Sequence, residues 1–238
     1  MSLISKAPPR RPFKAKGSNI TRCEQCQMPQ SACICELTPE LDTEASFWLL
    51  MHHNEQYKPT NTGRLLLSAI KGGGRTIWQR KEPDFRLLHL LARKDRYPIL
   101  VFPEPLAVNN SVASPAETAA QSRHGRKPVF LLLDATWQQA RKMYNHSPYL
   151  YNLPVLGINP ERPSRYQLRR SQKESHLCTA EVGAECLAWL GENSAANVMH
   201  DYFDVFNERY QAARNNQIIT ESDAMVRLRQ YRAECGQF

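Results

Sequence analysis

The chain has 238 residues, of which 42% are hydrophobic, and it carries a formal net charge of +8 with an isoelectric point near 9.2. This length suits one large domain or one domain with a small appendage, and the hydrophobic content excludes a disordered protein. No apolar run approaches the roughly 20 residues that span a bilayer, and the basic amino-terminus lacks the apolar segment of a signal peptide. We therefore expect a soluble, cytoplasmic monomer with reduced thiols and no membrane association.

The positive charge is clustered. Residues 1–20 are rich in proline, lysine and arginine and predict a flexible basic tail. Residues 161–173 carry five cations against one acid. Such clusters neutralise phosphates, so they favour a nucleic-acid partner over the alternative, a solvated basic face.

Residues 21–36, which follow the basic tail, contain four cysteines within 13 positions: Cys23, Cys26, Cys33 and Cys35. Closely spaced cysteine pairs are typical of tetrahedral zinc sites, so the segment predicts a structural zinc knuckle. Four thiolates could also bind an iron–sulfur cluster, but nothing else in the sequence indicates electron transfer. The remaining alternative is four unpaired reduced thiols.

An alternation of apolar strands and helices follows. Strands are predicted over 46–52, 75–79, 98–102, 128–133 and 153–157. Helices are predicted over 62–71, 83–93, 137–144, 180–190, 197–213 and 221–233. The stretch 103–127 is polar and poorly patterned, and we expect a mobile loop at its end. The alternation predicts an α/β fold with a mostly parallel sheet, helices on both faces and a helical carboxyl-terminal region.

The strand at 128–133 is the most informative, because it runs directly into Asp134 and is followed by a helix from Trp137. Ligands of open α/β sheets bind at the carboxyl ends of strands. A carboxylate can pair with an amine or accept a proton, and an indole face attracts a sulfonium or ammonium ion. Each residue also has a structural explanation: Asp134 as an N-cap or helix-dipole partner, Thr136 in a capping box with Gln139, and Trp137 in the core.

Two later segments combine polar, basic and aromatic residues. Residues 164–169 place Tyr166 between Arg165 and Arg169, which suits stacking on RNA bases and pairing with phosphates. Residues 174–181 lead into the helix near 180, with Thr179 as its predicted N-cap. Free N–H groups at such a helix end can bind a carboxylate.

The tetrapeptide Asp134-Ala135-Thr136-Trp137 resembles the D-x-T-W signature of the DTW-domain proteins, the tRNA-uridine aminocarboxypropyltransferases. Further segments occur in the expected order: 23–35, 61–66, 139–143, 164–169 and 178–181. The resemblance covers roughly residues 21–215, and this ordered set is far more specific than the tetrapeptide. One departure is Cys-Thr-Ala-Glu-Val at 178–182, where Ser-Thr-x-Glu-Ala is expected.

The resemblance implies a catalytic domain over 37–238 that is related to the knotted SPOUT fold. It implies transfer of the 3-amino-3-carboxypropyl group of S-adenosylmethionine to N3 of a tRNA uridine in the variable loop, with release of methylthioadenosine. The alternatives are a SPOUT-like RNA methyltransferase and a non-catalytic zinc module that binds RNA.

The resemblance also suggests residue roles. Asp134, Thr136 and Trp137 are the expected catalytic residues, with Asp134 as the base or as the group that orients the donor's amine. Donor binding is expected from Thr136, Trp137, Thr179 and Glu181. RNA binding is expected from Arg64, Arg141, Arg165, Tyr166, Arg169 and Arg170.

Overall fold

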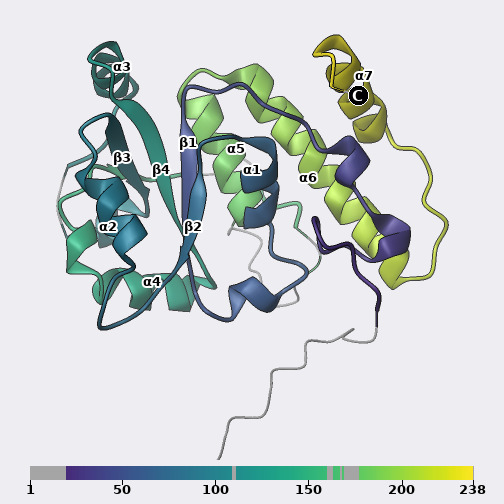
Figure 1. Cartoon of the computed structure of the whole chain (residues 1–238), viewed down its shortest axis with the longest axis horizontal. Coiled ribbons are helices and arrows are strands. Elements are labelled where there is room, and N and C mark those ends of the chain that lie inside the picture. Colours follow the sequence, from purple (N-terminus) through teal and green to yellow (C-terminus); the bar gives the residue numbers. More distant parts are fainter. Residues whose placement is uncertain (1–19, 109–110, 160–162, 167, 169–176, 238) are drawn as a thin grey trace, which may run out of the picture.

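The computed structural model of the chain describes residues 20–108, 111–159, 163–166, 168 and 177–237. In these ranges five strands form one parallel sheet with the order β2-β1-β4-β3-β5 (Figure 1). The strands are β1 (Ser46–Met51), β2 (Gly74–Ile77), β3 (Arg96–Val101), β4 (Lys127–Asp134) and β5 (Val155–Leu156). The predicted parallel sheet is confirmed.

Helices cover both faces of this sheet, also as predicted. The longer helices are α1 (Gly63–Ala69), α2 (Phe85–Ala92), α3 (Pro115–Arg123), α4 (Trp137–Asn145), α5 (Thr179–Trp189), α6 (Asn193–Arg214) and α7 (Asp223–Glu234). Helices α1, α5 and α6 contribute to the core on one face, and α2 and α4 to the core on the other (Figure 1). The chain also contains short 3-10 turns: η1 (Gln30–Ala32), η2 (Cys35–Leu37), η3 (Glu55–Tyr57), η4 (Glu104–Leu106) and η5 (Pro148–Leu150).

The central strand β4 explains why its sequence is a continuous apolar run. Phe130 and Leu132 are buried in the core on the α1–α5–α6 face, and Val129 and Leu131 in the core on the α2–α4 face. Both faces of a strand must be apolar when helices cover both sides of a parallel sheet. The polar residue that ends this run, Asp134, therefore lies at the carboxyl edge of the sheet.

The stretch 103–127 was predicted to be poorly structured, with a mobile loop at its end, but it contains α3, and only a short turn at 124–126 joins this helix to β4. The Oγ of Ser114 accepts a hydrogen bond from the backbone N–H of Glu117 (3.2 Å), and Pro115 occupies the first turn. Thr118 alone is buried among the residues of α3, so the helix shows no apolar periodicity. The Ser-Pro-Ala-Glu sequence, a helix-start signal, was the available evidence.

The start of α2 also differs from the prediction. Asp84 is its N-cap, accepting from the N–H of Arg86 at 2.9 Å, so Pro83 precedes the helix rather than opening it.

The cysteine knuckle (residues 21–36) packs against the helices at the end of the chain. Met28 and Ile34 are fully buried in the same core as α6 and α7. The hydroxyls of Thr38 and Tyr202 lie 2.9 Å apart, and Arg232 of α7 donates to the carbonyl of Thr38. The knuckle thus depends on carboxyl-terminal residues for its packing.

Two expectations concern parts of the chain that the structure describes incompletely. The basic tail at 1–20 lies outside the described residues except for Ile20. The SPOUT relationship and its knot stay predictions, because part of the segment between β5 and α5 is also outside them. Among the described helices, none combines the length and apolar character of a membrane span.

Candidate functional site

Asp134 is a buried acid in contact with three segments of the chain. It ends β4, pairs in register with Met51 of β1, and is 2% exposed. Its Oδ1 accepts a hydrogen bond from the hydroxyl of Thr179 (2.7 Å), and its Oδ2 accepts one from the side-chain amide of Asn61 (2.7 Å). The carboxylate therefore joins the β1–α1 connection to the start of α5; Asp134, Asn61 and Thr179 are called the Asp134 site below.

The β1–α1 connection is itself tightly bonded. Asn61 also donates to Oε2 of the buried Glu55 (3.3 Å), whose other oxygen pairs with Lys58 at 2.6 Å. The hydroxyl of Thr62 accepts from the backbone N–H of Ala180 in α5 (3.3 Å). A second contact thus links this connection to α5, next to the carboxylate.

Gly63 fits closely against the acid. A Cβ at this position would lie 2.7 Å from Cδ1 of Leu49, 3.1 Å from Oδ2 of Asp134 and 3.3 Å from Oδ1 of Asn61. Gly63→Ala should therefore displace the Asn61 contact, destabilise the fold by about 1–3 kcal/mol and lower any activity that depends on the Asp134 site. Thermal unfolding and turnover measure the two effects. The control is Ser68→Ala at an exposed position of the same helix, where the hydroxyl bonds Leu65 and Tyr202 and does not contact the Asp134 site. Equal behaviour of the two variants would contradict the prediction.

Thr179 was predicted to cap α5, and this is wrong. Cys178 is the N-cap and Thr179 is the first helical residue, so its hydroxyl is free to reach Asp134. The N–H of Cys178 donates to Oε2 of Glu181 (2.8 Å), as in a capping box. The departure from the family pattern, cysteine for serine at 178, therefore falls on the cap and not on the residue that contacts the acid.

Glu181 positions a neighbouring segment. It is 3% exposed, and besides Cys178 it accepts from the hydroxyl of Ser164 (2.6 Å) and the backbone N–H of Arg165 (2.7 Å). Three donors thus surround this carboxylate. We propose that Glu181 orders residues 164–165 beside the site instead of contacting a small-molecule ligand directly.

Glu181→Gln tests this role. In the variant, an amide nitrogen would face hydrogen-bond donors of the protein in place of one Glu181 oxygen that now accepts from them. The free energy of unfolding should therefore fall by about 1–3 kcal/mol. We expect faster hydrogen exchange at 163–166 in the variant. Glu185→Gln, one turn further along α5 and partly exposed, should leave both quantities unchanged. A variant with wild-type melting temperature and exchange would refute the positioning role.

The solvent side of the site is formed by the start of α4. Thr136 is exposed, and Oε1 of Gln139 accepts from its hydroxyl (2.9 Å) and its N–H (3.0 Å), which confirms the predicted capping box. Trp137 is 38% exposed and stacks on Phe102 with ring centroids 6.0 Å apart, so it is not a core residue. Its exposed area is available to a ligand.

Two of the predicted RNA-binding residues are used inside the fold. Tyr166 is 6% exposed; its hydroxyl donates to the carbonyl of Thr60, and its ring lies 6.1 Å from that of Phe203. All three nitrogens of Arg64 donate to backbone carbonyls. Neither side chain is arranged for contact with a large external ligand.

The other predicted RNA contacts are placed differently. Arg141 is exposed on α4. Arg165 is half exposed and pairs with Asp204 (2.5 Å) and with Nδ1 of His200 (3.0 Å). Arg169 and Arg170 lie outside the described residues.

Sequence reasoning missed the roles of Asn61, Thr62, Gly63 and Ser164. The available signal was the short polar run after β1, Asn61-Thr62-Gly63, since residues that follow neighbouring parallel strands meet at one sheet edge. Asn61 was considered only as a cap of the predicted 62–71 helix, and the neighbouring Arg64 was predicted to contact RNA.

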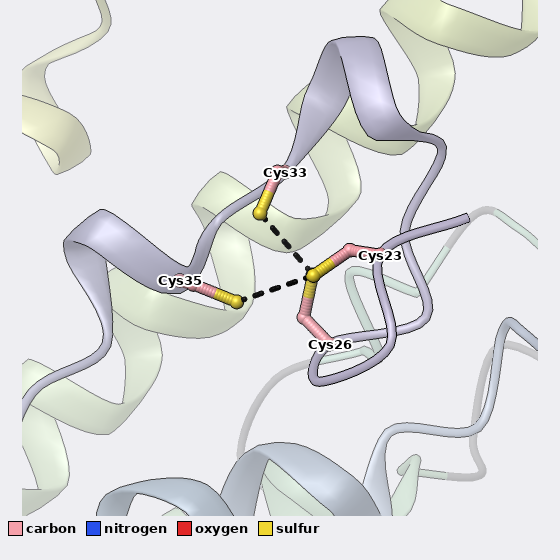
Figure 2. Close-up of side chains that lie close together, drawn as sticks. All are labelled: Cys23, Cys26, Cys33 and Cys35. Carbon is pink, nitrogen blue, oxygen red and sulfur yellow. Dashed lines mark hydrogen bonds between the residues drawn. The ribbon is translucent and has the colours of Figure 1, made fainter. Parts of the chain in front are cut away.

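The four predicted metal ligands do converge. Their Sγ atoms all lie within 4.8 Å of one another, with Cys23–Cys35 at 3.6 Å and Cys26–Cys33 at 3.8 Å (Figure 2). Tetrahedral ligation at a Zn–S distance of about 2.3 Å places sulfurs about 3.8 Å apart. The donor set therefore fits a single metal ion, and an iron–sulfur cluster, which is larger, would need wider spacing.

The pKa values of the thiols in the cluster are also consistent with binding of a cation. A backbone hydrogen bond from Cys26 lowers the pKa of the Cys23 thiol to about 7. Burial raises the pKa of the Cys33 and Cys35 thiols above their ordinary values. Since thiolates are the metal-binding form, a cation at the centre would offset the cost of ionising the partly buried Cys33 and Cys35 thiols.

The fold and the two clusters define an α/β protein with a buried polar cluster at the carboxyl edge of its sheet and four cysteine thiols that could hold a metal ion. The sequence matches the DTW domain over residues 20–211, and the chain belongs to the DTW-domain family. It is 30% identical over 192 residues to tRNA-uridine aminocarboxypropyltransferase 2 of Drosophila melanogaster, an alignment that covers 79% of this chain and 70% of the fly protein. No solved structure matches the chain. The predicted family membership is confirmed.

Proposed function

We propose that the protein transfers the 3-amino-3-carboxypropyl group of S-adenosylmethionine to N3 of a uridine in the variable loop of tRNA. The observation that carries this proposal is the Asp134 site, a buried carboxylate at the D-x-T-W signature in a chain 30% identical to a named tRNA-uridine aminocarboxypropyltransferase. The net charge of +8 suits a polyanionic substrate.

The residues at the sheet edge match the chemistry of this donor. When bound, the donor would supply the methylene carbon next to its sulfonium as the point of attack. The carbon–sulfur bond breaks as the N3–carbon bond forms, methylthioadenosine leaves with the bonding electron pair, and the N3 proton is released to water or to Asp134. The exposed indole face of Trp137 would pack against the positive sulfur, an interaction that contributes about 0.5–2 kcal/mol.

Asp134 has its main role in orientation under this proposal. Both of its oxygens already accept hydrogen bonds, from Thr179 and Asn61, and only 2% of the residue is exposed. Its charge fixes these two polar side chains at the site, and alignment of reactants contributes several kcal/mol in such transfers. Direct removal of the N3 proton by Asp134 is the alternative role.

We further propose that the cysteine cluster binds Zn²⁺ as a structural ion, because four thiolates at tetrahedral spacing match its preference. RNA contacts are assigned to Arg141 on the exposed face of α4 and to Arg169 and Arg170. Arg165 joins them if RNA phosphates displace its bond to Asp204. A cytoplasmic, monomeric protein stays our expectation.

The decisive experiment is nucleoside mass spectrometry of tRNA incubated with the protein and S-adenosylmethionine. We expect an aminocarboxypropyl-uridine and an equal amount of methylthioadenosine. Formation of S-adenosylhomocysteine would establish a methyltransferase instead. Absence of donor binding by calorimetry, together with tRNA binding, would indicate a non-catalytic RNA-binding module.

A further inference from the structure

One arginine lies between the cysteine cluster and the Asp134 site. Nη1 of Arg64 donates to the carbonyl of Cys26 (3.3 Å), Nη2 to that of Lys58 (2.9 Å), and Nε to that of Asn61 (3.1 Å). The guanidinium is a rigid planar fork, so it fixes the relative positions of the three carbonyls it binds. A metal ligand and the residue that binds the acid are therefore connected through a single side chain.

The connection continues to the acid without a gap. Asn61 receives Arg64 at its backbone carbonyl and donates from its side-chain amide to Oδ2 of Asp134 at 2.7 Å. Hydrogen bonds from a charged donor are stronger than neutral ones, and more so away from water. Burial also lowers the pKa of the Arg64 guanidinium, which agrees with a desolvated position.

We propose that Arg64 is a positioning residue that makes the order of the 58–63 loop, and hence of the Asp134 site, depend on the metal-bound cysteine knuckle. Loss of the metal releases the Cys26 thiol, so the backbone that carries the Cys26 carbonyl is no longer held in place. Arg64 then loses one of its three fixed partners, and Asn61 is no longer fixed against the acid. The expected effect of Arg64 on S-adenosylmethionine binding rests on the proposed function. Its expected effect on the order of the 58–63 loop does not.

A second arginine provides a matched comparison. Arg209 of α6 is 8% exposed, donates from Nη1 to the carbonyl of Cys33, and binds Oε1 of Glu36 from Nη2 at 3.0 Å. Like Arg64, it binds the backbone of a cysteine in the cluster. Its recorded partners lie in the knuckle and in α7, and none is in the 58–63 loop.

The test compares Arg64→Met with Arg209→Met in the full, metal-loaded chain, by hydrogen exchange with mass spectrometry and by calorimetry with S-adenosylmethionine. With its metal content retained, Arg64→Met should speed exchange at 58–63 by at least about tenfold, as expected for lost buried hydrogen bonds. Its donor affinity should fall as well. Arg209→Met should speed exchange at 30–37 and leave 58–63 and donor affinity as in the wild type.

A chelator arm tests the coupling itself. Removing metal from the wild type should speed exchange at 58–63, whereas in Arg64→Met it should add little there, because coupled changes are not additive. Should Arg64→Met fail to fold, Arg64→Lys keeps the charge without the planar fork and should show the same loop effect.

Three results would overturn the proposal: unchanged exchange at 58–63 in the Arg64 variants, an equal effect of Arg209→Met at 58–63, or no response of this loop to metal removal. If the wild-type chain binds no S-adenosylmethionine, the proposed function fails while the exchange data still decide the role of Arg64.

Discussion

Replacing Asp134 by asparagine is expected to lower the single-turnover rate of aminocarboxypropyl transfer by about 100- to 10,000-fold. The substitution keeps the shape of the side chain but removes its charge, and it places an amide nitrogen where an oxygen now accepts from Thr179 or Asn61. One donor then loses its acceptor inside a site that is 2% exposed. We expect a folded protein that is less stable by about 1–3 kcal/mol.

The matched variant Thr179→Val distinguishes the two roles of the acid. It removes the hydroxyl that donates to Oδ1 and leaves the carboxylate in place. If Asp134 acts by orienting its partners, Thr179→Val should lose much of the rate, and the double variant should be no slower than Asp134→Asn. If Asp134 removes the N3 proton, Thr179→Val should be mild. Turnover of Asp134→Asn near the wild-type rate would remove the acid from the mechanism.

A large loss of stability is expected when the cysteine cluster can no longer bind a metal ion. Cys23→Ser combined with Cys26→Ser removes two of the four thiols within 4.8 Å of one another, so the metal should be lost. Structural zinc contributes about 10–16 kcal/mol in isolated zinc-finger peptides. In this larger core we expect a loss of several kcal/mol, which lowers the melting temperature by about 10 °C or more.

Elemental analysis and thermal unfolding measure these effects. Cys235→Ser is the control, because that thiol is exposed and outside the cluster. It should keep both the metal content and the melting temperature of the wild type. Unchanged metal content in the double variant would rule out the assignment of the cluster as a metal site.

Features of the sequence that are local in the chain predicted the structure well. Four cysteines within 13 positions predicted the cysteine cluster. An apolar strand that ends at Asp134 predicted the residue at the carboxyl edge of the sheet. The partners of Asp134 are a different case, since Asn61 and Thr179 lie 73 and 45 residues away in the chain. No pattern within one segment shows which distant side chains converge on a carboxylate.

Burial was the other property that the sequence could not determine. An aromatic residue beside arginines suits RNA stacking, but Tyr166 is 6% exposed and its hydroxyl is bonded to the backbone. Arg64 likewise has the charge of a residue that binds phosphate, but its three nitrogens donate to backbone carbonyls inside the fold. Exposure depends on tertiary packing, so composition alone does not distinguish these roles.

The packing of the knuckle against α6 and α7 has a consequence for biosynthesis. Tyr202, Arg209 and Arg232 lie 164 to 194 positions after the residues that they contact, Cys33 in the knuckle and Thr38 just after it. At translation rates of about 5–20 residues per second, the ribosome needs roughly 10–40 s to add them. During that interval the four thiols are in a nascent chain without their final packing. The packed form of the metal site should therefore be completed only after α6 and α7 have been synthesised.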